Sequence, residues 1–458
     1  MKHYIYFCIL LLINTIQAQT SDSLLILSPE QMKEDVLFFY KKIEEIHPNP
    51  YCVLDKAHYE TKKQELLNSL DKPMNKIEFW LKIGQLNSIY DAHTRVGFPG
   101  NIVEFLSENK SFFFFNGMLK ARNKHLYLSN LDGIPDSLKN REILSINNIP
   151  TSEIVNNILN YISHESKITI DLHLSRSYFS LLYPLLYDMP QVLNVECVDN
   201  LTNNNKNITL SMEDFAQWDS VSGEFEKSSF KPYSFKYYEK EDIAIFDLNT
   251  FSLHKEGDKD KFDKFIKKAI DTLNMHNIKH LFVDITRNQG GNSSYANIFL
   301  DYFNMPKKIY GGEVTYKVSQ KTKKYMNQVD TLTKKYYYRK TKKPCTYKNN
   351  VYLLQSNLTF SAAVTLSTLF KYNKVGTIIG EETAGLTACY IDSRGFYLPN
   401  SGFYMCSSLK AHIEPGGKWD GRGVLPDVEY QIENPEKSFT LEQFKAMLQL
   451  IEEYKKNQ

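Results

Sequence analysis

The sequence predicts an α/β protein of several domains. The chain has 458 residues, and at roughly 100 to 200 residues per domain it is too long for one compact core. From about residue 242 onward, buried strand-like runs alternate with helical patterns, which indicates a largely parallel sheet flanked by helices. Residues 28–90 are helical in pattern, and residues 96–212 carry short apolar runs separated by turn residues. We therefore expect a helical N-terminal unit, a β-rich middle domain and an α/β core.

Composition and charge describe a globular protein and exclude several classes of function. Hydrophobic residues make up 42% of the chain and charged residues 24%, which excludes a disordered, collagen-like or coiled-coil protein. Lys and Arg number 55 against 53 Asp and Glu, so the net charge is only +2. This balance gives no electrostatic reason to expect nucleic acid or an anionic membrane as a partner. We expect the function to reside in a local site.

The first residues have the pattern of a secretory signal peptide. A basic start precedes an apolar run from Tyr4 to Ile13, and small and polar residues follow around Ala18. The run is too short to span a bilayer comfortably, and an uncleaved membrane anchor is the alternative interpretation. We expect residues 1–18 to be removed, a mature chain that starts near Gln19, a periplasmic or extracellular location, and no membrane span after cleavage.

Local patterns predict the helices of the first two parts. Ser28 is a fair N-cap for a helix that stops at Pro48. Further helices are expected at residues 58–70 and 76–90, and one at residues 151–162 interrupts the strands of the middle part. The runs expected to form strands there are residues 112–119, 125–131, 142–149, 168–174, 193–198 and 208–212.

The α/β core is predicted from its alternation of strands and helices. The expected elements are strands at residues 243–251, 280–285, 351–355 and 377–382, and helices at residues 258–275, at residues 294–303 and from Ser361. Thr440 and Gln443 have the spacing of a capping box, so an amphipathic helix should end the chain.

Cysteine and histidine spacing give no sign of a metal site. Five cysteines follow the signal peptide, in an odd number and far apart, which fits neither a disulfide framework nor a CxxC pair. One bridge is compatible with the count, and at least one thiol should stay free. The histidines form no HExxH pattern or paired cluster. We expect no metal and no organic cofactor.

A basic, tyrosine-rich segment interrupts the α/β part. Residues 317–348 carry eleven Lys or Arg side chains and a single acidic one, with Tyr336, Tyr337 and Tyr338 in the middle. One interpretation is a solvated surface excursion. A second is a flap that contacts substrate, because interleaved cations and aromatic rings can hold an extended polymer. Nucleic acid binding is a third, which the expected secretion and the neutral overall charge disfavour.

Ser361 has a chemically useful place in the sequence. It follows a buried strand and a polar loop and begins a helix-forming run. A hydroxyl at a helix N-terminus lies beside unsatisfied backbone N–H groups, so the amide of Ala362 would help to bind a developing oxyanion. The alternative interpretation is a plain N-cap, because there is no GxSxG motif around Ser361.

A glycine pair follows the predicted strand at residues 280–285. Gly290 and Gly291 would let backbone N–H groups approach a ligand closely. The loop lacks the Lys of a P-loop and the third Gly of a dinucleotide-binding motif, so phosphate binding is disfavoured. An oxyanion donor or a simple tight turn are the interpretations that remain.

Three further residues are candidates with ordinary structural alternatives. His93 lies where a helix gives way to a loop, and histidine is the natural general base near neutral pH, although a lone histidine is often structural. Asp420 and Asp427 lie in a Gly-rich stretch, where turn chemistry is the alternative.

Taken together, these stretches resemble the S41 family of serine peptidases, which includes tail-specific, carboxy-terminal-processing and tricorn-like proteases. The resemblance covers most of the mature chain. Its motifs appear in the family's order: DAHT at residues 91–94, FVDITRNQGG at 282–291, TFSAA at 359–363, GEETAG at 380–385 and GRGVLPD at 421–427. Residues 140–159 look like part of the PDZ-like domain that such proteins often carry.

The resemblance implies a fold and its domain boundaries. The signal peptide at residues 1–18 would be followed by an N-terminal helical unit at residues 19–95 and a PDZ-like β-rich domain at residues 96–230. Residues 231–458 would form an S41-type core, similar to the ClpP and crotonase folds, with the C-terminal helix.

The resemblance also implies catalytic roles. The processing proteases use a lysine at the position of Leu386, so the tricorn-like branch, which uses a histidine, is the better match. Ser361 would then be the nucleophile, His93 its base and Asp420 the acid that orients the imidazole ring. Ala362 and one of Gly290 and Gly291 would donate to the oxyanion. Ala92 stands where tricorn has a serine in its relay.

The function expected from the resemblance is a secreted or periplasmic serine endopeptidase that acts on peptides or unfolded proteins through an acyl-enzyme. An inactive S41-like protein that binds peptides or apolar ligands is the alternative. A secreted scaffold that uses the PDZ-like part and the basic segment for binding is the third hypothesis.

Overall fold

The computed structural model describes residues 26–98, 119–128, 140–175, 177–188, 190, 192–199, 204–211, 231–305, 309–316, 347–432 and 438–456. The predicted signal peptide, the run at residues 112–118 and nearly all of the basic segment lie outside these residues. The chain divides into two compact units. Unit 1 comprises Met1–Phe230, Tyr316–Thr331 and Tyr390–Ala411, and unit 2 comprises Lys231–Thr315, Leu332–Cys389 and His412–Gln458.

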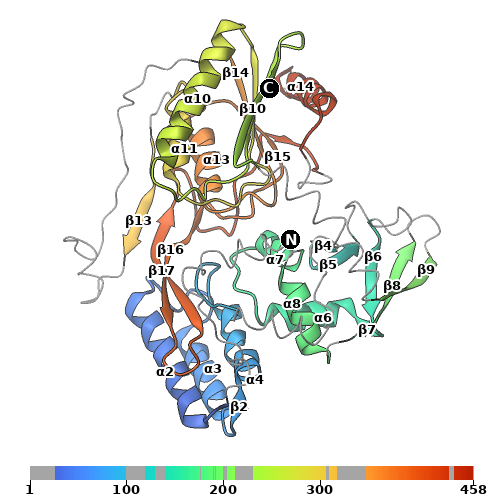
Figure 1. Ribbon diagram of the computed structural model, residues 1–458, viewed down its shortest axis with the longest axis vertical. Coiled ribbons are helices and arrows are strands. Elements are labelled where there is room, and N and C mark those ends of the chain that lie inside the picture. Colours follow the sequence, from blue (N-terminus) through green and yellow to red (C-terminus); the bar gives the residue numbers. More distant parts are fainter. Residues whose placement is uncertain are drawn as a thin grey trace. The chain divides into compact units, whose positions relative to one another are not determined.

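Unit 2 is built on a six-stranded sheet, as the alternation in the sequence predicts (Figure 1). Its order is β10 (Tyr233–Tyr238), β11 (Ile243–Leu248), β12 (His280–Asp284), β14 (Asn350–Gln355), β15 (Thr377–Gly380) and β18 (Val428–Glu429). From β11 to β18 all neighbours are parallel, and β10 adds an antiparallel edge. The carboxyl ends of β12, β14 and β15 therefore lie at one edge, where ligands bind in open α/β sheets.

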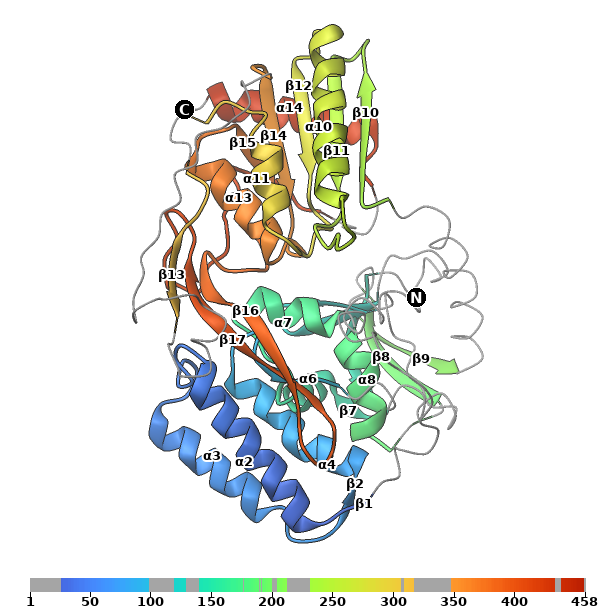
Figure 2. The same ribbon diagram turned by 60° about the vertical axis from the view of Figure 1, so that its left-hand side comes forward.

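Helices cover both faces of this sheet (Figure 2). The helices are α10 (Asp258–Met275), α11 (Ser294–Leu300), α13 (Ala362–Tyr372) and α14 (Leu441–Lys456). The first three share one apolar core with alternate strand residues, and α14 packs on the opposite face through Phe444 and Met447 against Phe282. The predicted capping box of α14 is present, since Thr440 Oγ1 accepts from the Gln443 N–H and Gln443 Oε1 from the Thr440 N–H.

Unit 1 begins with three helices close to their predicted positions. They are α2 (Pro29–Ile46), α3 (Lys56–Asn68) and α4 (Lys76–Ile83), and the chain continues past α4 as a 3-10 helix, Gly84–Ile89. Ser28 caps α2 in a capping box with Gln31. α3 begins two residues earlier than predicted, because Asp55 caps it: the Asp55 carboxylate accepts from the N–H groups of Ala57 and His58.

The middle part of unit 1 combines an antiparallel sheet with three helices. Its strands are β4 (Leu119–Arg122), β5 (His125–Leu128), β6 (Glu142–Ile146), β7 (Ile149–Pro150), β8 (Val192–Asp199) and β9 (Asn204–Ser211), in the order β4-β5-β6-β8-β9 with β7 beside β6. Its helices are α6 (Thr151–Leu159), α7 (Lys167–Leu174) and α8 (Ser177–Leu186).

The prediction of a strand at residues 168–174 is wrong, because these residues form α7. The apolar residues of this stretch alternate in the manner of a strand, which favoured the wrong period. The helix is started by Ser166, whose hydroxyl accepts from the Thr169 N–H. Packing also fixes it, since Ile170 and Leu174 enter the apolar core of unit 1.

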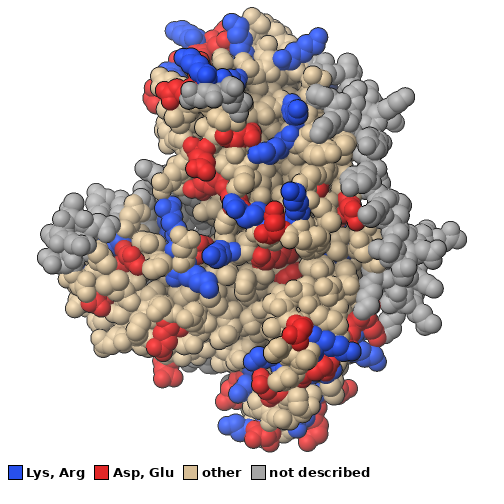
Figure 3. Space-filling model, turned by 180° about the vertical axis from the view of Figure 1, so that it is seen from behind, with Lys and Arg blue, Asp and Glu red and all other residues tan. Residues whose placement is uncertain are grey.

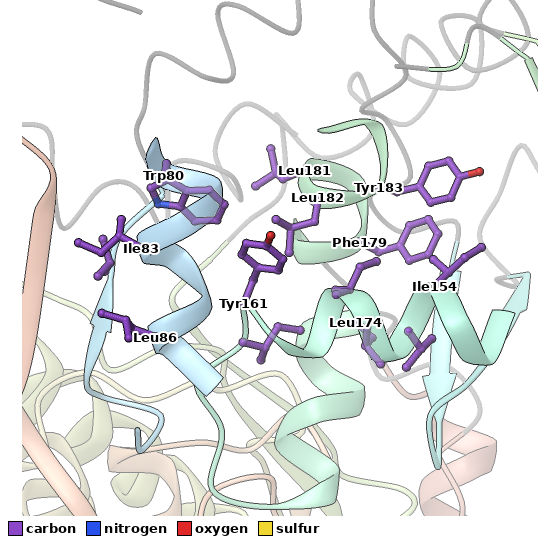
Figure 4. Packing of buried hydrophobic residues seen from close by; sticks show 14 of the residues in the cluster. Trp80, Ile83, Leu86, Ile154, Tyr161, Leu174, Phe179, Leu181, Leu182 and Tyr183 are labelled. Atoms are coloured by element: carbon purple, nitrogen blue, oxygen red, sulfur yellow. The ribbon is translucent and has the colours of Figure 1, made fainter. Parts of the chain in front are cut away.

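The helices and the middle part of unit 1 share one apolar core (Figure 4). The ring of Trp80 in α4 stacks on Tyr161, with centroids 5.6 Å apart and an interplanar angle of 19°. Asn87 donates to the carbonyl oxygen of Tyr161 at 3.1 Å, which joins the same two segments by a polar contact. The domain boundaries predicted at residues 95 and 230 stay a prediction.

A long hairpin completes the architecture. β16 (Ala388–Tyr397) and β17 (Tyr404–Ile413) lie in a sheet of order β13-β17-β16, where β13 is Glu313–Tyr316. A short strand, β3 (Arg95–Val96), pairs with β17 through Val96 opposite Met405 and Arg95 opposite Cys406. A second short pair joins β1 (Ile26–Leu27) to β2 (Met74–Asn75). The hairpin thereby fixes the chain just after His93.

Two general findings concern the described residues alone. None of their helices is both long enough and apolar enough to span a bilayer. On the face drawn in Figure 3, acidic and basic side chains are interspersed over the described surface rather than gathered by sign.

Candidate active site

Ser361 stands in a strained turn at the start of α13. Its backbone has φ 52° and ψ −124°, a conformation that costs a non-glycine residue of order 1–3 kcal/mol. Its side chain makes no capping hydrogen bond, so the plain N-cap interpretation does not describe this serine. The N–H groups of Val364 and Thr365 both donate to the Ser361 carbonyl oxygen, at 2.8 and 3.3 Å. The first helical turn thus closes on Ser361 and leaves its half-buried hydroxyl outside the cap.

The predicted glycine pair packs directly against this turn. A Cβ added at Gly290 would lie 2.7 Å from the Ser361 Cβ, and one at Gly291 would lie 2.2 Å from the Phe251 backbone. Both residues have positive φ, 98° and 130°. The Phe251 N–H donates to the Gly290 carbonyl oxygen at 3.0 Å, which anchors the pair to the chain after β11. Only glycine fits at either position.

Two backbone N–H groups near Ser361 are free to bind a ligand. The Gly290 N–H donates to Asn288 Oδ1 at 2.8 Å, whereas the N–H of Gly291 has no acceptor among the described residues. The Ala362 N–H, at the first position of α13, also has no acceptor there, as expected for the first turn of a helix. These two groups are candidate donors to an oxyanion.

Buried polar side chains tie the loops after β12, β14 and β15 to one another. Asn288 donates to the Leu248 carbonyl oxygen at 2.9 Å and accepts at its own carbonyl oxygen from the Phe360 N–H at 3.1 Å. Thr359 donates to Ile285, and its carbonyl oxygen accepts from Ala384 at 3.0 Å. The turn that holds Ser361 is therefore fixed from both neighbouring loops.

His93 lies in unit 1, in a loop held by hydrogen bonds to β17. The His93 N–H donates to Asp91 Oδ1 at 3.0 Å, and the Cys406 thiol donates to the His93 carbonyl oxygen at 3.3 Å. The Ser408 N–H donates to Thr94 Oγ1 at 3.0 Å. The backbone on both sides of His93 is thus fixed.

Asp91 is the buried centre of this loop. Ser408 donates to its Oδ1 at 2.7 Å, and His47 Nε2 lies 2.7 Å from its Oδ2. The Asn49 N–H donates to His47 Nδ1 at 3.0 Å, so the neutral ring carries its proton on Nε2 and donates to Asp91. Burial alone would raise the pKa of Asp91, but the hydrogen bonds from His47 and Ser408 outweigh it, and the pKa lies below 3.8.

Glu165 is the carboxylate that faces the His93 ring, and sequence reasoning missed it. Its Oε1 lies 3.9 Å from His93 Nδ1, which is an ion-pair distance rather than a hydrogen bond. The side chains are 7% and 18% exposed. Burial lowers the pKa of His93, but Glu165 and the charge of Asp91 outweigh it, so that pKa lies above 6.5. Burial raises the pKa of Glu165 against the opposing effect of His93.

Asp420 occupies an exposed turn in unit 2. Its Oδ1 accepts from the Arg422 N–H at 3.0 Å. Arg422 in turn makes a two-pronged ion pair with Glu382, at 2.9 and 2.7 Å. Asp427 has a structural role, because it accepts from the Ile378 N–H at 2.9 Å and pairs with Lys371. The predicted role of Asp420 as the orienting acid stays a prediction.

Potential metal ligands meet twice around Asp91, in groups that the spacing of the sequence did not reveal. One group joins His47, Cys52 and Asp91, and the other joins Asp91, His93 and Glu165. Both oxygens of Asp91 already accept hydrogen bonds, and burial raises the pKa of the Cys52 thiol to about 12. Among the described residues, hydrogen bonding accounts for the Asp91 side chain without an ion. The described cysteines, Cys52, Cys197, Cys389 and Cys406, are all free thiols.

The sheet, the glycine turn and the serine at a helix start are features of a hydrolase with a serine nucleophile. Residues 242–430 match the model of peptidase family S41. These residues therefore form a peptidase domain of the S41 family, and the chain is a serine peptidase. The predicted α/β multidomain fold with an S41 peptidase domain is confirmed at this level.

Solved structures share the fold. The crystal structure of mature CPAF aligns with a TM-score of 0.58 at 12% identity and covers 88% of this chain and 92% of that chain. The structure of mature CPAF complexed with lactacystin aligns with a TM-score of 0.57 at 13% identity, over 88% and 94%. At such identity the likeness concerns the fold, and it extends well beyond the matched peptidase domain.

Proposed function

We propose that this S41 peptidase hydrolyses peptide bonds through an acyl-enzyme on Ser361. The observation that carries the proposal is the strained Ser361, with its hydroxyl outside the cap and the Ala362 and Gly291 N–H groups without acceptors among the described residues. A nucleophile must be exposed to substrate, and an oxyanion hole must keep donors unoccupied until charge develops. Peptides or unfolded proteins are the substrates that the family implies.

The proposed roles follow acyl-transfer chemistry. Ser361 Oγ attacks the scissile carbonyl carbon while His93 takes the hydroxyl proton. The carbonyl oxygen becomes an oxyanion, to which the N–H groups of Ala362 and Gly291 donate. Gly291 is preferred to Gly290 for this role because the Gly290 N–H already donates to Asn288 Oδ1. Return of the proton from His93 to the amine releases the first product. Water then attacks the acyl-enzyme by the same route and frees Ser361.

We propose Glu165 as the carboxylate that orients and stabilises the protonated His93 ring. It faces His93 Nδ1 at 3.9 Å, so Nε2 is the nitrogen that would take the proton of the nucleophile. In the relay inferred from the resemblance, Asp420 has this role, but Ala92 removes the serine that tricorn uses in it. A carboxylate on Nδ1 keeps the tautomer that a general base needs.

The test compares the purified protein with its Ser361→Ala and His93→Gln variants on a mixture of unfolded proteins, with mass spectrometry of new peptide ends. Cleavage by the parent protein that is lost in Ser361→Ala would establish the nucleophile and its specificity. Loss of about 10⁴-fold or more is expected for each variant, because nucleophile and base act as a unit. Absence of new peptide ends with all three folded proteins, across many substrates, would contradict the proposal and favour a binding protein.

For the middle of unit 1 we propose a PDZ-like role in substrate binding. The support is its antiparallel sheet with α6 against β6 and the resemblance of residues 140–159. Such a domain adds an extended peptide to a strand edge and captures a free carboxylate. Amidation of substrate C-termini should therefore lower kcat/KM, and equal cleavage of free and amidated peptides would exclude this role.

We also propose that the protein is exported, to the periplasm or the medium. The support is the signal-peptide pattern of the first 18 residues. Edman sequencing of the protein from fractionated cells should begin near Gln19. An intact Met1 on a protein in the cytoplasmic fraction would contradict this proposal.

A further inference from the structure

A second buried carboxylate lies beside the nucleophile turn within unit 2, and the roles proposed above leave it unused. Glu414 follows β17 and is only 5% exposed. Thr365 Oγ1 donates to its Oε1 at 2.6 Å. A carboxylate is rarely buried without partners, because loss of hydration costs several kcal/mol. Its location therefore calls for a function.

Helix geometry places this carboxylate near Ser361. Thr365 lies in the first turn of α13, and its N–H donates to the Ser361 carbonyl oxygen at 3.3 Å, so the two residues are direct neighbours at the start of the helix. Side chains of a helix lean toward its N-terminus, so the Thr365 hydroxyl and the Glu414 oxygen bound to it lie on the side of the nucleophile.

The backbone of Glu414 is held by the loop that packs on Ser361. The Glu414 N–H donates to the Thr387 carbonyl oxygen at 2.8 Å, and the Gly417 N–H donates to the Glu414 carbonyl oxygen at 2.8 Å. Two residues before Thr387 is Gly385, where an added Cβ would lie 3.2 Å from the Ser361 nitrogen. Glu414 and Ser361 are thus fixed to the same loop.

One oxygen of Glu414 is left for a ligand. Its Oε2 is buried and has no hydrogen-bond partner in the part of the chain that the structure describes. His412 is the neighbouring histidine, and its Nδ1 lies 3.8 Å from the other oxygen, Oε1. A buried acceptor without a donor is costly, so a complementary donor brought by a ligand would be strongly favoured.

We propose that Glu414 is the carboxylate of a substrate subsite that binds an ammonium or guanidinium group beside the scissile bond. The inference rests on the proposed role of Ser361 and adds a substrate class to it: peptides with a basic side chain, or a free amino terminus, next to the cleaved bond. A buried carboxylate gives such selectivity because a neutral side chain would leave Oε2 without a donor.

The experiment measures kcat/KM for paired peptides that carry lysine or norleucine at each position around the cleaved bond. Each pair is made with a free and with an acetylated amino terminus, which separates a basic side chain from a terminal amine as the bound group. The parent protein should prefer the cationic peptide by about 10-fold or more, and Glu414→Gln should abolish the preference while norleucine peptides are still cleaved.

Glu429→Gln, which removes an exposed carboxylate of the same unit, is the matched control and should keep the preference. Absence of a preference in the parent protein, or an unchanged preference in Glu414→Gln, would overturn the inference.

Labelling by a fluorophosphonate separates this inference from the proposed function. The reagent phosphonylates an activated serine with loss of fluoride and makes no demand on a basic side chain. A parent protein that neither labels at Ser361 nor cleaves would refute the nucleophile, whereas labelling without charge selectivity would refute the subsite alone. If Glu414→Gln does not fold, the inference is tested on the parent protein alone. There n-butylammonium should slow the labelling of Ser361, and n-butanol at the same concentration should not. Equal effects of the two compounds would overturn the inference.

Discussion

The turn that holds Ser361 in unit 2 and the loop that holds His93 in unit 1, the histidine loop, are built in different ways. The turn is made by backbone: Gly290, Gly291 and Ser361 adopt positive φ, and loops at neighbouring strand ends hold them. The loop is made by side chains, with Asp91 receiving donors from His47 and Ser408, residues 44 and 317 positions away. Backbone geometry can be recognised from a short local motif, whereas the distant side-chain partners of Asp91 cannot be recognised from the DAHT motif at residues 91–94. The two regions should therefore also fail in different ways when mutated.

The largest effect is expected at Gly291. A Cβ at this position would lie 2.2 Å from the Phe251 backbone, at φ 130°. Gly291→Ala should lower the free energy of unfolding by about 3–5 kcal/mol, because strain and overlap add. The control is Gly421→Ala, also at positive φ but with no atom within 4 Å, which should cost about 1–2 kcal/mol. Urea unfolding measures both, and equal losses would show that the overlap does not determine the turn.

The histidine loop should be most sensitive at Asp91. Asp91→Asn removes the buried charge to which His47 and Ser408 donate and should cost about 3 kcal/mol at pH 7, whereas Ser408→Ala removes one hydrogen bond and should cost about 1 kcal/mol. Because the pKa of Asp91 is lowered in the folded protein, its contribution is complete above the unfolded value of 3.8 and is lost as the pH falls through the lower folded pKa. The difference between parent and variant should therefore shrink on acidification. A difference that is constant with pH would exclude the charge as its origin.

Glu165 should act on the pH dependence of turnover more than on stability. With the pKa of His93 raised above 6.5, kcat/KM should rise with pH through a midpoint above that value, as the base loses its proton. Glu165→Gln removes the carboxylate and leaves burial to lower the pKa, so the midpoint should move down and kcat should fall by about 10- to 100-fold. An unchanged midpoint would exclude Glu165 as the orienting group.

The smallest effect is expected at Asp420. Its side chain is exposed and accepts from the Arg422 N–H, so Asp420→Asn should change kcat by less than about twofold. The same pH profiles measured for Glu165→Gln provide the comparison. If Asp420→Asn instead shows the larger loss of kcat, Asp420 is the orienting acid, as the resemblance implies.

Much of unit 2 was predictable because the local sequence pattern and the packing of the folded chain favour the same secondary structure. The helix predicted at residues 258–275 is α10 with those bounds, since its apolar stripe is regular and faces the sheet. The strand predicted at residues 168–174 is wrong because alternating apolar and β-branched residues favour a strand, while the Ser166 cap and burial stabilise a helix. The hairpin of β16 and β17 was not predicted at all. Glu165 was missed because nothing near it in the sequence points to His93.

The bonds from β17 to the histidine loop have a consequence for the timing of folding. Ser408 reaches Asp91 across 317 positions, so the loop cannot take its final form until β17 has been synthesised. A nascent or truncated chain that ends before β17 lacks Ser408, which bonds to Asp91 and Thr94, and Met405, which pairs with Val96. The order of synthesis itself thus delays the assembly of the proposed catalytic base until β17 is available.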